Sequence, residues 1–220
     1  MPPAKVICLT NGVFQENCYI VGDPEAGEAV LIDPGEEADL FLRRLDTEAW
    51  NLKQIWLTHA HVDHVQGVAR IVGERPVPVY LHPEDRPLYG GVSQQASWLG
   101  VGTVEELPAV KDLAGGQTLA VGAVTFEVRH VPGHSPGSVA FVTPGMAFVG
   151  DAVFAGSIGR TDLPGGDTGL LLSSIGSQLL SLPDETALYP GHGPETTVGR
   201  ERLTNPFLAA QALRRADAPY

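Results

Sequence analysis

The 220-residue sequence has few cysteines, few basic residues and no long apolar segment. Its 14 Lys and Arg residues are outnumbered by 26 Asp and Glu residues, and the formal net charge is -12. Because nucleic-acid binding needs basic surfaces that contact phosphates, we predict no nucleic-acid partner. The chain has no apolar run of about 18 residues and no amino-terminal signal segment. We therefore expect a soluble cytoplasmic protein with no membrane partner.

The two cysteines, Cys8 and Cys18, lie in apolar segments that resemble strands. Free cysteine behaves as a small apolar residue and is usually buried, so we expect two buried free thiols. A disulfide between neighbouring strands is the less favoured alternative in a cytoplasmic protein.

Turn residues and hydrophobic periodicity predict strands and helices in both halves of the chain. In the first half, Asn-Gly, Gly-Asp-Pro and Asp-Pro-Gly separate short apolar segments, and apolar spacing predicts helices over residues 37–50 and 64–72. The second half repeats this order, with a predicted helix over residues 169–182. The predicted strands cover residues 6–9, 18–21, 29–32, 54–57, 76–81, 117–121, 124–130, 138–142, 147–149 and 186–189.

Hydrophobic residues make up 43% of the chain and charged residues 18%, a composition sufficient for one packed core. No linker or run of like charges separates the two halves. We therefore predict a single domain over residues 1–220, built from two similar halves, about 1–112 and 113–220. The composition does not fix the oligomeric state.

Proline and glycine interrupt residues 82–107, although Leu88, Tyr89, Trp98 and Leu99 supply bulky apolar side chains. Two interpretations stay open for this segment. It is either a loop-rich flap over a pocket or a surface excursion that packs on the core.

The segment over residues 58–64 reads Thr-His-Ala-His-Val-Asp-His and follows a predicted strand. Burying several unpaired imidazoles and a carboxylate is costly, and a metal ion relieves that cost. His59 and His61 are two residues apart, so on an extended backbone their side chains point the same way and can bind one ion. Asp63 and His64 can serve a second ion, although Asp63 is also a natural helix N-cap.

Three later segments each end an apolar run beside glycine, at residues 130–137, 148–151 and 189–194. Tight turns at strand ends are where rigid scaffolds present functional groups, and glycine lets the backbone approach a bound ion or substrate closely. Together with the histidine segment, they indicate a site at one end of the predicted strands.

This order of motifs resembles the metallo-β-lactamase superfamily, and in particular its short glyoxalase-II-like (hydroxyacylglutathione hydrolase-like) members. The resemblance covers nearly the whole chain, to about residue 208, and includes residues 31–35, 156–162 and 191–208. It implies an α+β fold, an αββα sandwich of two mixed β-sheets flanked by helices. The residues that carry it are His59, His61, Asp63, His64, His134, Asp151 and His192.

The resemblance implies two divalent metal ions, with zinc as the first choice and iron or manganese as alternatives. One ion would bind His59, His61 and His134, and the other would bind Asp63, His64 and His192. Asp151 would bridge both ions. The implied activity is hydrolysis of a small-molecule thioester, such as glutathione-linked S-lactoylglutathione, by a metal-bridging hydroxide. Asp63 and Asp151 would be the catalytic residues, with Asp63 either a ligand or a base.

Two other functions on the same fold stay open. A mononuclear-iron glutathione persulfide dioxygenase would use a ligand set that resembles His59, His134 and Asp151, whereas other hydrolases cleave an ester or lactone. A metal-binding protein without turnover is a third class. Long glyoxalase II proteins contact glutathione through an additional carboxyl-terminal helical region. Here a single short helix is predicted over residues 205–215, so we expect those contacts to be missing or rebuilt.

Several residues near these motifs have supporting or undecided roles. Metal-bound imidazoles need hydrogen-bond acceptors, and Asp33 and Thr58 are the first candidates. Arg160 and Asp162 either pair with each other or leave Arg160 free to bind a substrate carboxylate. The basic residues near the carboxyl terminus are expected at the surface, and they are Arg200, Arg202, Arg214 and Arg215.

Overall fold

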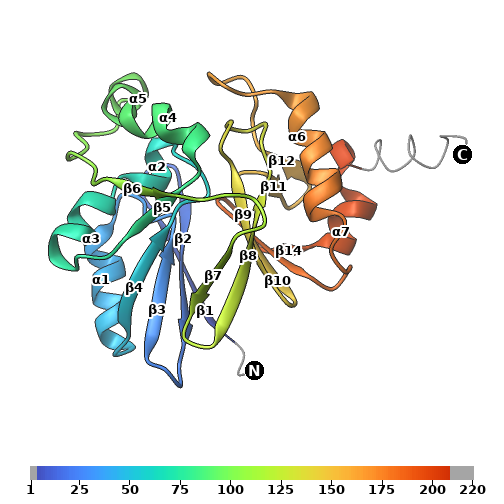
Figure 1. Ribbon diagram of the computed structural model, residues 1–220. Helices are drawn as coiled ribbons and strands as arrows, with labels where there is room; N and C mark the ends of the chain where they lie inside the picture. The colour runs from blue at the N-terminus through green and yellow to red at the C-terminus, as the bar shows by residue number, and fades with distance from the viewer. Residues whose placement is uncertain (1–3, 209–220) are drawn as a thin grey trace, which may run out of the picture.

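Two six-stranded sheets pack face to face in the computed structural model, which describes residues 4–208 (Figure 1). The first sheet has the strand order β1-β2-β3-β4-β5-β6. Its first three strands are antiparallel and the later pairs are parallel, so the sheet is mixed. The strands are β1 (Lys5–Asn11), β2 (Glu16–Asp23), β3 (Glu28–Ile32), β4 (Asn51–Trp56), β5 (Val79–Leu81) and β6 (Val110–Asp112).

The second sheet has the strand order β14-β13-β10-β9-β8-β7. Its strands pair antiparallel except for β10 and β13, which run parallel. A separate hairpin of β11 (Val153–Phe154) and β12 (Ser157–Ile158) follows β10. The strands of the sheet are β7 (Thr118–Val121), β8 (Val124–His130), β9 (Val139–Thr143), β10 (Met146–Gly150), β13 (Ala187–Pro190) and β14 (Thr196–Thr197).

Helices cover the outer face of each sheet (Figure 1). The helices α1 (Ala38–Thr47), α2 (Val62–Val65) and α3 (Val68–Glu74) lie beside the first sheet. On the other side are α6 (Thr168–Ser174), its π-helical continuation η2 (Ile175–Leu179) and α7 (Val198–Thr204). The connection between β5 and β6 forms a 3₁₀ turn, η1 (Pro83–Asp85), and the helices α4 (Arg86–Gly90) and α5 (Val92–Leu99). Within residues 4–208, no helix is long and apolar enough to cross a membrane.

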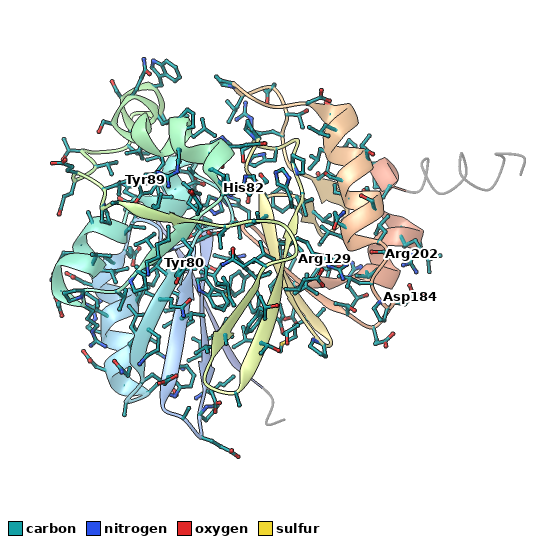
Figure 2. The ribbon with its side chains drawn as sticks, in the orientation of Figure 1. Tyr80, His82, Tyr89, Arg129, Asp184 and Arg202 are labelled. Carbon is teal, nitrogen blue, oxygen red and sulfur yellow. The ribbon has the colours of Figure 1, made fainter. Side chains whose placement is uncertain are left out.

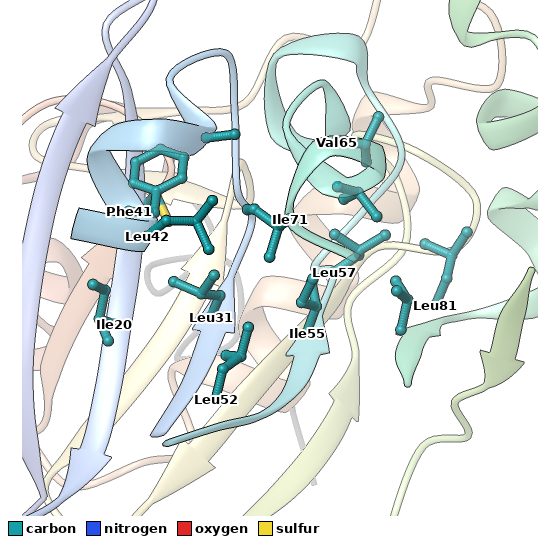
Figure 3. Close-up of a cluster of buried hydrophobic side chains, with 14 of the residues drawn as sticks. Ile20, Leu31, Phe41, Leu42, Leu52, Ile55, Leu57, Val65, Ile71 and Leu81 are labelled. Carbon is teal, nitrogen blue, oxygen red and sulfur yellow. The ribbon is translucent and has the colours of Figure 1, made fainter. Parts of the chain in front are cut away.

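The two sheets and the two sets of helices form four layers, and three apolar clusters fill the spaces between them. In the central cluster, the fully buried Trp56 packs against Phe126 and Phe141 across the two sheets, with ring centroids 5.2 Å apart in each pair. Burying a phenylalanine side chain such as Phe126 or Phe141 stabilises the fold by about 1.5–3 kcal/mol. Figure 3 shows one outer cluster, in which Phe41 of α1 and Ile71 of α3 lie over the first sheet. The predicted α+β class and αββα sandwich are therefore confirmed.

The prediction of a loop-rich segment over residues 82–107 is wrong in one respect, because η1, α4 and α5 are helical. Pro83 and Pro87 occupy the first turns of η1 and α4, where the missing N–H of proline costs no helical hydrogen bond. Other differences concern very short elements. The strands β6, β11, β12 and β14 were not predicted, since two or three residues are too few to show an alternating pattern.

The expectation of two buried thiols is wrong for Cys8, which is exposed, and correct for Cys18. Cys8 lies on β1, an edge strand whose side chains alternate between the core and the solvent. Both thiols are free, so the expected absence of a disulfide is confirmed. Most of the helix predicted over residues 205–215, with Arg214 and Arg215, lies outside the described residues. The division into two similar halves stays a prediction.

Candidate metal centre

Loops at one end of the sandwich, together with the short helix α2, carry all seven candidate donor residues. Each of these loops follows the carboxyl end of a strand, so the rigid sheets fix where their side chains lie. His59 and His61 follow β4, and Asp63 and His64 belong to α2 directly after them. The other three residues, His134, Asp151 and His192, follow β8, β10 and β13.

A first group of donor atoms joins both sheets. His134 Nε2 lies 2.8 Å from His61 Nδ1 and 3.2 Å from His59 Nε2. His59 and His134 are buried, and His61 is 9% exposed. Three imidazole nitrogens that converge at this distance are typical of a shared metal ion.

A second group of donor atoms lies beside the first. His192 Nε2 is 3.2 Å from Asp63 Oδ2, and His64 Nε2 is 3.7 Å from the same oxygen. Within each group, the candidate donor atoms all lie within 4.8 Å of one another. Both groups therefore have the size of a single-ion site.

The Asp151 carboxylate lies between the two groups. Its Oδ1 is 3.4 Å from His64 Nε2, and its Oδ2 is 3.6 Å from His134 Nε2 and 3.5 Å from His192 Nε2. His64 Nε2 and Asp151 Oδ1 are buried without a hydrogen-bond partner. Since buried polar atoms are normally paired, these two atoms fit a metal ion as their missing partner.

Backbone carbonyls fix the orientation of two imidazoles. His134 Nδ1 donates a hydrogen bond to the carbonyl oxygen of Arg160 at 2.7 Å, and His192 Nδ1 donates to that of Phe14 at 3.1 Å. Because a carbonyl can only accept, the proton of each neutral ring is on Nδ1. Each Nε2 is therefore free to bind a metal ion.

A buried network of Asp33 and Thr58 does the same for His59 and His64. Asp33 Oδ2 accepts from His64 Nδ1 at 3.1 Å and from Thr58 Oγ1 at 2.5 Å. Since the hydroxyl proton of Thr58 is given to Asp33, Thr58 Oγ1 accepts from His59 Nδ1 at 3.0 Å. The prediction that Asp33 and Thr58 support the site histidines is confirmed.

The charges of the centre favour bound cations. Burial and the neighbouring imidazoles lower the pKa of His59, and the same causes lower the pKa of His61 to about 3. Both rings are therefore neutral at neutral pH, as a metal ligand must be. Burial lowers the pKa of His64, but the carboxylates of Asp151 and Asp63 outweigh it and hold that pKa well above its usual value. A positive charge is thus stabilised beside these carboxylates.

Sequence reasoning missed Asp85, a fully buried carboxylate that joins two donor-carrying loops. Its Oδ2 accepts from Ala60 N at 2.9 Å and from Ser135 Oγ at 2.8 Å, and its Oδ1 accepts from Gly137 N at 2.6 Å. Ala60 lies between His59 and His61, and Ser135 follows His134. Burial raises the pKa of Asp85, although these hydrogen bonds oppose the shift. In the sequence, Asp85 appears only as an aspartate shortly after a predicted strand. Such aspartates are common in turns, so its position did not indicate a buried role.

A cavity of about 670 Å³ opens above the donor atoms. The helices α4 and α5 form one wall, and the β11–β12 hairpin with the loop that follows it lies across from them (Figure 1). Residues 82–107 therefore border a pocket, as the flap interpretation expects. Arg160 also lines the cavity, and its guanidinium is held by both oxygens of Asp162 at 2.7 and 2.8 Å.

Arg202, on α7, lies away from this centre (Figure 2). Figure 2 shows Arg202 and Asp184 next to each other at the outer edge of the molecule, where they form an ion pair. Arg202 also donates to the carbonyl oxygen of Leu180 at 2.6 Å. The expectation that Arg202 is a surface residue is confirmed.

Two adjacent His and Asp groups that share a carboxylate, below a pocket at the edge of an αββα sandwich, define a metallo-hydrolase. A family model described as the Metallo-beta-lactamase superfamily matches residues 11–192. The chain belongs to this superfamily.

Individual relatives extend over nearly the whole chain. A Haemophilus influenzae protein named hydroxyacylglutathione hydrolase GloC is 37% identical over 203 residues, which cover 90% of this chain and 95% of that protein. The crystal structure of TTHA1623 in a di-iron-bound form is 47% identical, has a TM-score of 0.85 and covers 92% of this chain and 100% of its own. That of the BLEG-1 B3 metallo-beta-lactamase is 39% identical with a TM-score of 0.86, covering 93% and 99%.

Proposed function

We propose that this metallo-hydrolase cleaves thioesters, with S-lactoylglutathione as the first substrate to test. The observation that carries the proposal is the position of Asp151, whose carboxylate lies within 3.6 Å of donor nitrogens from both groups. Its Oδ2 is near His134 of the first group and His192 of the second, and its Oδ1 is near His64 of the second. The relative named hydroxyacylglutathione hydrolase supports the choice of a thioester. Oxygen esters and lactones are the alternative substrates for the same centre.

In this proposal, His59, His61 and His134 hold one divalent ion. The second ion is held by Asp63, His64 and His192, and Asp151 contacts both. Zinc is our first choice because mixed nitrogen and oxygen donors suit it, although iron suits the same donors. The solved relative described as di-iron-bound supports a two-ion site.

When bound, two such ions supply a water molecule of lowered pKa and a Lewis acid for the carbonyl oxygen. The protein orients the donor atoms through the hydrogen bonds to their imidazole rings. Burial by itself raises the pKa of Asp63, but His64 and His192 outweigh that effect and keep the carboxyl ionised at neutral pH. Asp63 can therefore act as a ligand or accept a proton from the attacking water. Asp63→Asn that retains both ions and loses turnover would assign it the second role.

The test is the steady-state rate of S-lactoylglutathione hydrolysis, followed by loss of thioester absorbance. Protein reconstituted with zinc, manganese or iron is compared with a chelated sample. We expect metal-dependent turnover that falls at least about 1,000-fold in Asp151→Ala, because a two-metal site loses both activated water and charge stabilisation. Leu203→Ala, at an exposed position on α7, is the matched control.

Absence of turnover with every thioester and every metal would contradict the proposal. Oxygen consumption with glutathione persulfide and iron would then favour a mononuclear dioxygenase that uses His59, His134 and Asp151. Retention of turnover in Asp151→Ala would instead place the reaction at a different centre.

A further inference from the structure

Large apolar side chains form the walls of the cavity above the metal centre. Trp98 and Leu99 of α5 are 68% and 49% exposed, and Phe14, in the turn between β1 and β2, is 38% exposed. Phe154 and Ile158 of the β11–β12 hairpin complete the wall. Contiguous exposed apolar groups usually mark a binding surface. The floor, in contrast, contains the candidate donors.

One polar side chain of the α5 wall, Gln95, is already engaged with the protein. Gln95 Nε2 donates to the carbonyl oxygens of Ala60 at 3.2 Å and Leu88 at 2.8 Å, and its Oε1 accepts from Val62 N at 3.1 Å. This side chain therefore holds α5 against the segment that carries His59 and His61, and it has no amide proton left for a ligand.

The charges around the cavity disfavour an anionic ligand. Arg160 is the one Lys or Arg among the described residues that line the cavity, and Asp162 holds it with two hydrogen bonds. The chain as a whole has a net charge of -12. Recognition of carboxylates normally uses free, bidentate arginines. The walls thus provide apolar contact and no unpaired cation for the carboxylates of a glutathione moiety.

We infer that the preferred substrate is a thioester with an apolar acyl group larger than lactoyl, aliphatic or aromatic, which packs against Trp98, Leu99 and Phe14. This inference rests on the proposed thioester hydrolysis and specifies the substrate class of the same site. A cavity of about 670 Å³ lies within the range of small-molecule sites. It leaves room for an acyl chain beside the reacting carbonyl.

The kinetic test varies the acyl group while glutathione stays constant. S-lactoylglutathione and S-(2-methylpropanoyl)glutathione differ by a hydroxyl in place of a methyl group, and S-hexanoylglutathione extends the chain. One buried methylene changes affinity about fourfold, so we expect kcat/KM for hexanoyl to exceed that for lactoyl at least about tenfold. An equal or higher kcat/KM for lactoyl than for both apolar acyl groups would overturn the inference and leave the thioesterase proposal intact.

A binding test does not require turnover. The chain has three tryptophans, of which Trp50 and Trp56 are 6% and 0% exposed, so a ligand in the cavity changes the surroundings of Trp98. We expect S-hexylglutathione, a thioether that cannot be hydrolysed, to shift the emission of Trp98 to shorter wavelength. Glutathione alone should not do so, and Trp98→Phe should abolish the shift. No shift at millimolar S-hexylglutathione would contradict apolar binding.

Variants separate this inference from the proposed reaction. Trp98→Ala and Leu99→Ala should lower the ratio of hexanoyl to lactoyl kcat/KM at least about threefold each, because each removes apolar contact area. Leu203→Ala, whose side chain is 79% exposed and does not line the cavity, should leave the ratio unchanged. If no thioester is hydrolysed but the Trp98 shift occurs, the reaction is misassigned and the apolar site stands. An unchanged ratio in both α5 variants would refute the site.

Discussion

Replacement of Asp85 by alanine tests whether one buried carboxylate holds the metal centre together. The change removes the common acceptor of Ala60 N, Ser135 Oγ and Gly137 N, at 2.9, 2.8 and 2.6 Å. Each hydrogen bond to a charged group contributes about 1.5–3 kcal/mol, and the contributions are not fully additive. We therefore expect the free energy of unfolding to fall by about 4 kcal/mol.

The assay combines urea denaturation of the metal-loaded protein with a chelator competition for zinc. At this size, about 4 kcal/mol corresponds to a decrease in Tm of about 8–16 °C. Zinc affinity should fall at least about tenfold, because the loops that carry His59 and His134 lose their shared anchor. Asp85→Asn keeps one accepting oxygen and should lie between the wild type and alanine.

Asp39→Ala is the control for this prediction, because Asp39 is an exposed carboxylate that pairs with Arg70 at 3.1 Å. Such surface pairs contribute about 0–1 kcal/mol. If Asp85→Ala lowers stability by no more than Asp39→Ala and retains its zinc affinity, Asp85 does not position the centre.

Three further predictions concern metal removal, a glycine and the thiols. Zinc at about 100 times its Kd should stabilise the fold by about 2.7 kcal/mol, seen as a Tm increase that a chelator reverses. Gly191→Ala should weaken zinc binding at least about tenfold in the same competition assay, since an added Cβ would collide with Asp151 Oδ1 and His64 Cε1; unchanged binding would contradict this. At pH 8, thiol titration should detect Cys8 first and Cys18 only after denaturation, because Cys8 is exposed, whereas Cys18 is buried and its burial raises the pKa of the thiol strongly. Burial thus lowers the thiolate fraction at this pH, and rapid modification of Cys18 in the native protein would contradict the packing of β2.

The four candidate donors of residues 59–64 were visible in the sequence because they lie close together along the chain, whereas His134, Asp151 and His192 were assigned as donors through the family resemblance. His59, His61, Asp63 and His64 lie within six residues, and a strand-to-helix turn is enough to bring them together. The strands that precede His134 and His192 were equally readable from their apolar runs. For these residues, short-range pattern and final geometry coincide.

Asp85 could not be recognised because its partners are 25 to 52 residues away along the chain. Aspartates in turns such as Pro-Glu-Asp usually lie at the protein surface. Asp85 lies beside the candidate metal centre only because β5, which precedes it, pairs with β4. A pocket beneath residues 82–107 was one of two open interpretations, but its helical wall was not predicted, because glycine and proline on both sides of α5 obscure the helical pattern of Trp98 and Leu99. Tertiary contacts, rather than local propensity, decide both features.

The first donor group has a consequence for folding, since it draws on both sheets. His61 and His134 are separated by 73 residues, and His59 and His134 by 75. An ion held there would act as a cross-link that closes a long loop, and such closure removes conformational entropy from the unfolded chain. Neither sheet carries the complete group by itself. Tight binding of the first ion would therefore report that the two sheets have packed together, so metal affinity would also be a measure of folding.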